Sequence, residues 1–290
     1  MSEQPSEIKN VLKVSPAQMP RHALVFDSPH SGQFYPDDFN YVCDKKYLQQ
    51  SEDRYVDELF SDVTEYGAPL LKALFSRAYL DVNRQQFDID PSMLQNEWPG
   101  TLQTSMRGKI GTGLIRYICR PDNPTPVYGG KLSVTHVQSR IKNYYTPYHT
   151  ALEQLINQTY DEFGLCYHLN CHSMPSRSVH HGGHSKIYQR KDFILGDRDG
   201  TSCALDFTQF IKQTLEAMGY TVGINDPYKG VELVRRYSNP SQGLHSIQIE
   251  INRSLYMDEA NLRKTSGFEP LKRNLNVLVE KIVEYLQRFV

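Results

Sequence analysis

The sequence predicts an α/β layered fold with a mixed, mostly parallel sheet. Two observations support this class: short apolar runs typical of strands alternate along the chain with longer segments of helical spacing, and several of these runs end directly in polar loops. No clear linker between domains is apparent in the 290 residues. We therefore expect a single domain over residues 1–290.

In the first half of the chain, the run at 23–26 predicts a buried strand that ends in a loop. Apolar residues from 44 to about 66 have helical spacing and predict one helix. Residues 70–81 predict one or two short strands. Residues from about 85 to 130 are rich in Pro, Gly and Gln without a sustained period, which predicts an irregular insertion or lid.

The second half predicts the remaining elements of the sheet and its covering helices. Helices are expected over residues 135–160, 204–218 and 270–289, and strands over 165–171, 221–224 and 245–253. Pro147 should kink or split the first of these helices, because proline lacks the N–H that a helix interior uses. Residues 174–186 are expected to form a loop.

Charge and composition exclude several function classes. Lys plus Arg is 32 and Asp plus Glu is 33, so the net charge is −1, which argues against a nucleic-acid surface or a polybasic membrane anchor. No run approaches roughly 20 apolar residues, and the N-terminus does not resemble a secretory signal. The five cysteines are odd in number and form no CxxC pair, which disfavours a disulfide framework or a thiolate zinc site. We expect a soluble, cytoplasmic protein.

Two histidines near the ends of predicted strands are candidate metal ligands. His30 lies in a turn, where a histidine is either a surface residue or a ligand. His168 and His172 would share one face of a helix, but in a strand their side chains are separated by about 13 Å, too far to bind one metal. At most one of them is then a ligand, and His172, at the loop end, is the better candidate.

A strand glutamate and an arginine are further candidates. Glu250 lies opposite three isoleucines in a strand of period two, which fits either an edge strand with one wet face or a general base. Arg84 follows another strand, where its guanidinium could clamp a carboxylate or form a structural ion pair with Asp81 or Asp88. Motifs for nucleotide binding and for serine esterases are absent from the sequence.

Taken together, eight stretches of the sequence resemble the N-formylglutamate amidohydrolase family. They occur in order over nearly the whole chain: SPHSGQFYPDDF at 28–39, EDRYVDELF at 52–60, GAPLLKALFSRAYLDVNR at 67–84, RPDNPTPVYGGKLS at 120–133, LNCHSM at 169–174, GDRDG at 196–200, NDPYKGVEL at 225–233 and HSIQIEINRSLYMDE at 245–259. The family is itself similar to the zinc carboxypeptidases. The resemblance implies a three-layer fold like that of the zinc carboxypeptidases, in which helices cover both faces of the sheet.

The resemblance also implies a catalytic zinc ion. Its ligands would be His30, His172 and a carboxylate, with a position left for water. Carboxypeptidases take His-x-x-Glu as the first two ligands, whereas this sequence has Gln33 in place of the glutamate. The family pattern points instead to Asp53 as the third ligand, with Asp57, one turn later, as the alternative.

The same resemblance implies roles around the metal. Glu250 would take a proton from the attacking water and pass it to the leaving amine. The substrate carries two carboxylates, so Asn83 and Arg84 are expected to bind one of them and Arg177 the other. Three further arginines remain open as alternatives for this second position: Arg116, Arg120 and Arg198.

The activity implied by the resemblance is hydrolysis of N-formyl-L-glutamate to formate and L-glutamate, the last step of one route of histidine degradation. Two alternatives remain: a hydrolase of another N-acyl amino acid or short peptide, and a non-catalytic binding protein on the same scaffold. The expected partner is a small-molecule N-acyl amino acid, without nucleic acid or membrane. The oligomeric state does not follow from the sequence.

Overall fold

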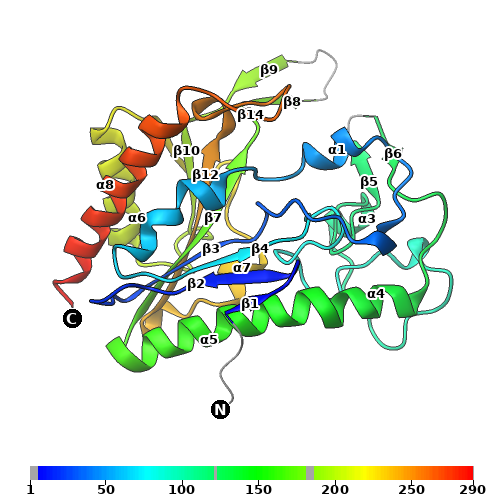
Figure 1. Cartoon of the computed structure of the whole chain (residues 1–290), viewed down its shortest axis with the longest axis horizontal. Coiled ribbons are helices and arrows are strands. Elements are labelled where there is room, and N and C mark those ends of the chain that lie inside the picture. The colour runs from blue at the N-terminus through cyan, green and yellow to red at the C-terminus, as the bar shows by residue number, and fades with distance from the viewer. Residues whose placement is uncertain (1–5, 121–122, 181–185, 290) are drawn as a thin grey trace. The chain divides into compact units, whose positions relative to one another are not determined.

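The computed structural model describes residues 6–120, 123–180 and 186–289 (Figure 1). The chain divides into two compact units. Unit 1 comprises Met1–Val14, Pro29–Glu52 and Leu71–Gln154, and unit 2 comprises Ser15–Ser28, Asp53–Leu70 and Leu155–Val290.

Unit 2 is built on five strands that neighbour one another in the order β3-β7-β12-β10-β11. The β3–β7, β7–β12 and β10–β11 pairs are parallel, and the β10–β12 pair is antiparallel. The strands are β3 (Leu24–Ser28), β7 (Cys166–Met174), β10 (Phe193–Gly196), β11 (Val222–Ile224) and β12 (Leu244–Asn252). The predicted mixed, mostly parallel sheet is therefore confirmed.

Helices cover both faces of these strands. On one face lie α2 (Val56–Leu59), α6 (Leu205–Ala217) and α8 (Phe268–Leu286), and α6 and α8 run side by side in Figure 1. On the other face α7 (Glu232–Arg236) packs against β7 and β12, and the Tyr237 ring that follows it meets the edge of His168. The predicted arrangement of helices on both faces is confirmed in this unit.

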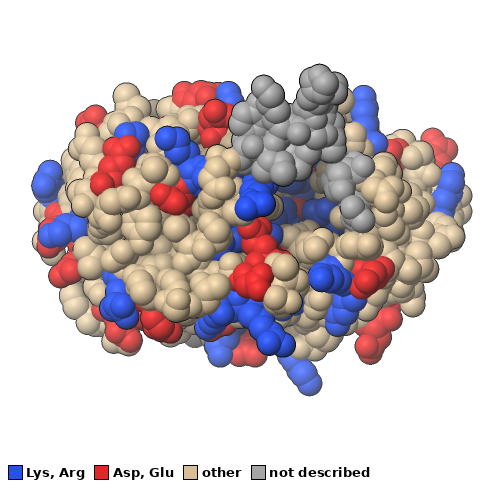
Figure 2. All heavy atoms as spheres, turned by 90° about the horizontal axis from the view of Figure 1, so that it is seen from above, with Lys and Arg blue, Asp and Glu red and all other residues tan. Residues whose placement is uncertain are grey.

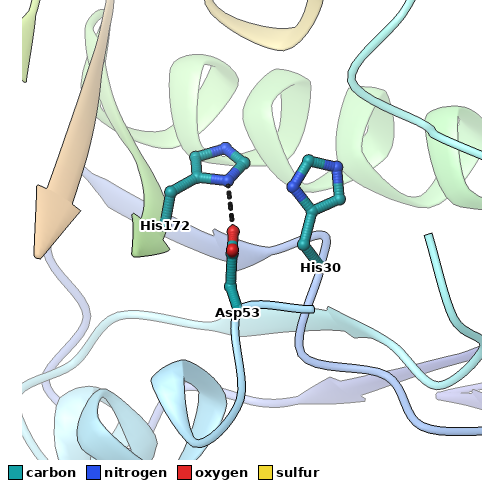
Figure 3. Close-up of side chains that lie close together, drawn as sticks. All are labelled: His30, Asp53 and His172. Carbon is teal, nitrogen blue, oxygen red and sulfur yellow. Dashed lines mark hydrogen bonds and ion pairs between the residues drawn. The ribbon is translucent and has the colours of Figure 1, made fainter. Parts of the chain in front are cut away.

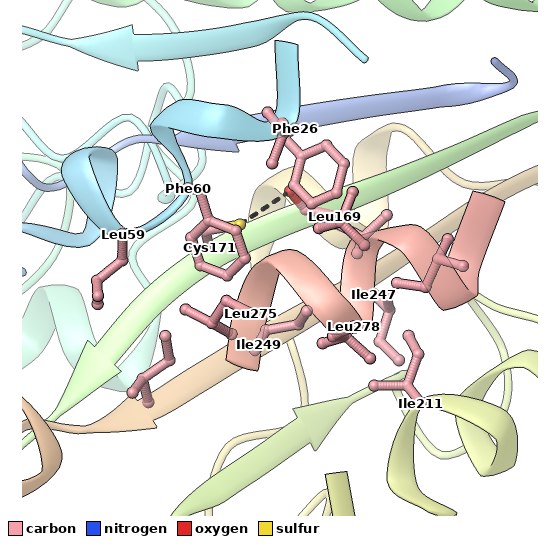
Figure 4. Close-up of a cluster of buried hydrophobic side chains, with 14 of the residues drawn as sticks. Phe26, Leu59, Phe60, Leu169, Cys171, Ile211, Ile247, Ile249, Leu275 and Leu278 are labelled. Atoms are coloured by element: carbon pink, nitrogen blue, oxygen red, sulfur yellow. Dashed lines mark hydrogen bonds between the residues drawn. The ribbon is translucent and has the colours of Figure 1, made fainter. Parts of the chain in front are cut away.

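The two faces of β7 and β12 differ sharply because side chains alternate along a strand. Leu169 and Cys171 of β7 and Ile247 and Ile249 of β12 point into the hydrophobic core under α6 and α8 (Figure 4). Burying a side chain such as Leu or Ile contributes about 1.5–3 kcal/mol to stability. The opposite face of the same strands carries polar side chains, and some of them belong to the candidate site described below.

Unit 1 contains shorter elements. They include the antiparallel pair β1 (Glu7–Ile8) and β2 (Leu12–Ser15), the helices α1 (Lys45–Gln49), α3 (Met106–Lys109) and α4 (Val134–Arg140), and the antiparallel pair β5 (Ile118–Arg120) and β6 (Thr125–Pro126). Three elements continue across a unit boundary in sequence: β2, β4 (Leu70–Ala73) and α5 (Thr146–Phe163). The described part of residues 85–130 has only short elements.

The single helix predicted over 44–66 is wrong. The segment forms α1, α2 and a 3-10 turn at Ser61–Thr64. Tyr55 adopts a left-handed φ of 69°, which a continuous right-handed helix does not allow. The helix predicted over 135–160 is present, and the predicted break near Pro147 appears as a π turn at Ile141–Tyr145 between α4 and α5.

The loop predicted over 174–186 is also wrong in part. Arg177–His180 forms β8 and pairs antiparallel with β9 (Lys186–Gln189), while residues 181–185 lie outside the described part of the chain. Pairing between strands is a non-local contact that a short polar stretch does not reveal on its own. One further antiparallel pair follows β12, made of β13 (Met257–Asp258) and β14 (Arg263–Lys264).

The surface carries charges of both signs. On the face drawn in Figure 2, Lys and Arg side chains are interspersed with Asp and Glu rather than gathered into one patch. This distribution accords with a net charge of −1 over the whole sequence. Across the described residues, none of the helices combines the length and apolar character needed to span a bilayer.

Candidate metal centre

Three buried side chains come together at the candidate site. One possible ligand atom from each of His30, Asp53 and His172 lies within 4.8 Å of the other two. Figure 3 shows the carboxylate of Asp53 facing the imidazole of His172, with the ring of His30 beside them. The group could therefore bind a metal ion. Of the alternatives for the third position, Gln33 is exposed, and Asp57 is half-buried and does not belong to this group.

The loop after β3 carries His30 and is held in place by tight backbone packing. A Cβ on Gly32 would lie 2.3 Å from the carbonyl oxygen of Phe75, so only glycine fits there. The imidazole is then fixed by its Nε2, which lies 2.7 Å from Oδ1 of Asp81. Because an ionised carboxylate only accepts, Nε2 carries the hydrogen, and Nδ1 is the nitrogen suited to a metal.

Asp81 is held as an anion by its surroundings. Burial by itself would raise the pKa of this carboxyl group, but Arg77, His30 and Arg84 outweigh it and keep the pKa well below its ordinary value. Arg77 Nη2 donates to Oδ2 of Asp81 at 2.7 Å, whereas Arg84 Nη2 is 4.0 Å from the same oxygen. The ionised carboxylate of Asp81 therefore accepts the hydrogen bond from Nε2 of His30 and fixes the orientation of the ring.

Asp53 lies just before α2 and is almost fully buried, so its charge requires partners. Arg253 Nη2 donates to Oδ1 of Asp53 at 3.0 Å, and its Nε donates to Oγ of Ser173 at 3.1 Å. The other carboxylate oxygen, Oδ2, lies 3.0 Å from Nδ1 of His172. Arg253 thus fixes the carboxylate with one oxygen directed at the histidine.

His172 is held from the opposite side of its ring. Its Nε2 lies 2.7 Å from Oδ1 of Asn170, two residues earlier on β7. Since that oxygen is an acceptor, Nε2 is the donor and Nδ1 faces Asp53. Both histidines therefore present Nδ1, the arrangement in which a second hydrogen bond fixes the ring of a metal-ligating histidine.

The donor set fits zinc. Two imidazole nitrogens and one carboxylate oxygen are the ligands of many catalytic zinc sites. Metal–ligand bonds of about 2.0–2.2 Å in a tetrahedron place ligand atoms roughly 3.4 Å apart. The separations in this group, all within 4.8 Å, need only small side-chain shifts to reach that geometry.

Glu250 lies beside His172 in the sheet. The two residues are paired across the parallel strands β12 and β7, and Glu250 Oε1 accepts a hydrogen bond of 2.8 Å from Gln248 Nε2. β12 lies between β7 and β10, so the alternative of an edge strand is wrong. The carboxylate is nearly buried, at 7% exposure, in the interior of the sheet.

Two residues near Glu250 are not apparent from the sequence. Burial raises the pKa of the Tyr228 phenol, and the charge of Glu250 raises it further. Arg190 Nη1 donates to the Tyr228 hydroxyl, and the guanidinium lies 5.0 Å from the centre of the ring. Tyr228 follows β11 and Arg190 precedes β10, so no local sequence pattern links either residue to Glu250.

Arg84 is buried in unit 1, with its guanidinium anchored to the backbone. Its Nε donates to the carbonyl of Thr112 at 3.2 Å and its Nη1 to that of Asn83 at 3.0 Å. Burial lowers the pKa of Arg84, and burial together with the charge of Arg77 lowers that of Arg116 to about 10. Three guanidinium groups therefore lie near the carboxylate of Asp81, and the charge of Asp88 also acts on Arg84. Arg77 could have been inferred from its position four residues before Asp81.

The other arginines considered from the sequence differ in their surroundings. Arg177 begins β8 and is exposed. Arg198 Nη1 donates to the carbonyl of Gly230 at 3.2 Å, which ties it to a neighbouring loop. The side chain of Arg120 lies outside the described part of the chain.

Comparison with known proteins places these features in a family. The family model for N-formylglutamate amidohydrolase matches residues 22–257. The crystal structure of an N-formylglutamate amidohydrolase from Ralstonia eutropha superimposes with a TM-score of 0.90 at 40% identity, covering 97% of this chain and 100% of that one.

Curated relatives support the same family at lower sequence identity. An N-formylglutamate deformylase from Pseudomonas aeruginosa is 26% identical over 242 residues, which cover 82% of this chain and 84% of the relative. One from Pseudomonas putida is 24% identical over 243 residues, covering 82% and 83%. From the extent of the family match and the 40% identity to a solved member, the chain belongs to the N-formylglutamate amidohydrolase family.

Proposed function

We propose that this protein is a zinc-dependent amidohydrolase that cleaves N-formyl-L-glutamate to formate and L-glutamate, as the last step of one route of histidine degradation. The observation that carries the proposal is the buried group of His30, Asp53 and His172, whose ligand atoms lie within 4.8 Å of one another. Family membership supports the choice of substrate, because the curated relatives are named N-formylglutamate deformylase.

The proposed chemistry divides between the metal ligands and Glu250. When bound, zinc would supply Lewis acidity for the formyl carbonyl and for water. His30, Asp53 and His172 would hold the ion, and Asp81 and Asn170 hold the two imidazoles by their Nε2 atoms. Glu250 takes a proton from the attacking water and delivers it to the amine nitrogen as the C–N bond breaks. One water is consumed for each formate and glutamate released.

The buried cations of unit 1 support an anionic substrate. Arg77, Arg84, Arg107 and Arg116 outnumber the two carboxylates of Asp81 and Asp88 whose charges act on them, so this region keeps an excess of positive charge. Burying like charges is costly, and an incoming carboxylate would relieve that cost. We assign Arg84 with Asn83 to one substrate carboxylate, and we keep Arg177 as the candidate for the other.

Replacing Arg84 tests this assignment. Arg84→Ala is expected to raise KM for N-formyl-L-glutamate by about 10–100-fold, because a charge-assisted hydrogen bond contributes about 1.5–3 kcal/mol. The KM for N-formyl-L-glutamine amide, which has amides in place of both carboxylates, should change little. Steady-state kinetics on both substrates gives the comparison, with the exposed Arg273→Ala on α8 as the control. Equal changes for both substrates would remove the clamp role from Arg84.

A formate-release assay tests the function itself. Purified protein is tested on a panel of N-acyl amino acids and short peptides, with and without a chelator. The proposal predicts highest kcat/KM for N-formyl-L-glutamate, loss of turnover after chelation and recovery on adding zinc. A higher kcat/KM for another acyl group would assign a different substrate to the protein. Turnover unaffected by metal removal would refute zinc dependence.

A further inference from the structure

A row of buried polar side chains runs along the face of the central strands that lies opposite the hydrophobic core. It consists of Asp27 on β3, His168 and Asn170 on β7, and Ser246 on β12, and each is at most 1% exposed. A buried polar group without a partner is destabilising, because it loses its hydrogen bonds to water. Four of them in adjacent strands therefore require a connected network, and a partly satisfied network would be worse than an apolar face.

The side chains form one continuous chain of hydrogen bonds. Asp27 Oδ1 is at its centre, 3.0 Å from Nε2 of His168 and 2.7 Å from Nδ2 of Asn170, which donates to it. The other ring nitrogen of His168, Nδ1, lies 2.7 Å from Oγ of Ser246. At the far end, Asn170 Oδ1 lies 2.7 Å from Nε2 of His172.

The direction of each bond follows from Asp27. A carboxylate only accepts, so it requires the NH₂ group of Asn170 on its side. The amide oxygen of Asn170 must then face His172, where it accepts from Nε2–H. This leaves Nδ1 of His172 directed at Asp53, 3.0 Å away. The carboxylate thus selects, through one amide, which nitrogen of His172 is presented at the candidate metal centre.

Ser246, His168 and Asp27 are the residue types of a catalytic triad, but they do not form one. In that arrangement the serine meets Nε2 and the aspartate meets Nδ1. Here the serine meets Nδ1 and the aspartate meets Nε2, and the Ser246 hydroxyl has 0% exposure. A substrate has no access to this serine, so its bond to His168 serves to hold the ring that in turn holds Asp27.

We propose that Asp27 and Asn170 are positioning residues for His172, and that His168 and Ser246 hold Asp27 in place. The four residues, which we call the relay, act on metal affinity through the orientation and tautomer of one ligand. This inference rests on the proposed function, since it gives His172 a metal to bind. It adds four residues that neither touch the substrate nor ligate the ion.

Zinc affinity of the purified full chain provides the test. Asn170→Ala removes the acceptor of His172 Nε2–H, and the dissociation constant for zinc, measured by competition with a chromophoric chelator, should rise about 10–100-fold. Asp27→Asn keeps an oxygen that can accept both bonds, so its dissociation constant should rise less, by about 3–10-fold. The d–d spectrum of the cobalt-loaded protein should change in the same order.

A matched serine separates positioning from stability. Ser202 is as buried as Ser246, but its Oγ donates to the backbone carbonyl of Ser246 at 2.9 Å and lies outside the relay. Ser202→Ala should lower the melting temperature of the metal-free protein while leaving the zinc dissociation constant unchanged. A purely structural role for the relay would give Asn170→Ala the same behaviour as this control.

The outcomes distinguish this inference from the proposed function. Zinc binding by the wild type with unchanged affinity in Asn170→Ala would overturn the relay and leave the function standing. Should Asn170→Ala fail to fold, Asp27→Asn decides by the same measurement, and an unchanged dissociation constant overturns the relay. Failure of the wild-type protein to bind zinc would overturn the proposed function, and the relay with it.

Discussion

Glu250→Gln is expected to retain its zinc and to lose turnover by about 10²–10⁴-fold, the usual contribution of a general acid–base group. The amide is nearly isosteric, and its oxygen can still accept the hydrogen bond that Gln248 Nε2 donates at 2.8 Å. The fold and the metal ligands should therefore be preserved. What disappears is a group able to take a proton from water and return it to the leaving amine.

The measurement is kcat for formate release beside zinc content for the same preparation. Glu216→Gln, on α6, is the control, because Glu216 is paired with Lys212 at the surface of unit 2. Wild-type rates in Glu250→Gln would refute the base assignment. Loss of zinc together with rate would instead assign Glu250 to the metal centre.

His172→Ala is expected to lose bound zinc and, with it, all measurable turnover. Its imidazole supplies one of three ligands, and its removal leaves His30 and Asp53 as a two-ligand site. The metal content after dialysis should fall from about one zinc per chain to near zero. Unfolding temperatures of the metal-free proteins show whether the variant keeps its fold.

His245→Ala serves as the control for this variant. His245 lies on β12, stacks on Tyr167 and accepts a hydrogen bond from the backbone N–H of Ala204, away from the candidate metal centre. It should retain about one zinc and most of the activity. Full zinc content in His172→Ala would show that the zinc is bound elsewhere.

The strand periodicity of β7 and β12 carried most of the predictive information. Alternation along these strands separated His172 and Glu250 from the isoleucines that face the core. A separation of about 13 Å over four residues of strand excluded His168 as a second ligand to the same ion. The structure shows what His168 contacts instead. His168 is buried two side chains behind His172, bonded to Asp27 and Ser246.

Local patterns failed where a backbone conformation or a distant partner decides the structure. The apolar spacing of residues 44–66 does not reveal that Tyr55 takes a left-handed φ of 69°, which divides the predicted helix. The β8–β9 pair, with Arg177 opposite Gln189, depends on a contact between separate segments. The interpretation of Glu250 as an edge residue failed because strand order is not contained in the pattern of one strand.

The residues that hold the ligands were the least predictable part of the site. Arg253 is far in sequence from Asp53, as Asp27 is from Asn170, and these contacts depend on where β3, α2, β7 and β12 meet. The same holds for Tyr228, whose pKa is raised by the charge of Glu250, and for Arg190, which donates to its hydroxyl. Sequence patterns identify the groups that could carry chemistry, whereas the tertiary fold determines which neighbours orient them.

Anomalous diffraction at the zinc absorption edge, from crystals of the zinc-loaded protein, tests the central claim most directly. We expect one strong peak about 2.0–2.2 Å from Nδ1 of His30, Nδ1 of His172 and a carboxylate oxygen of Asp53. A peak at a different set of side chains, or none at these three in crystals that contain zinc, would contradict the account.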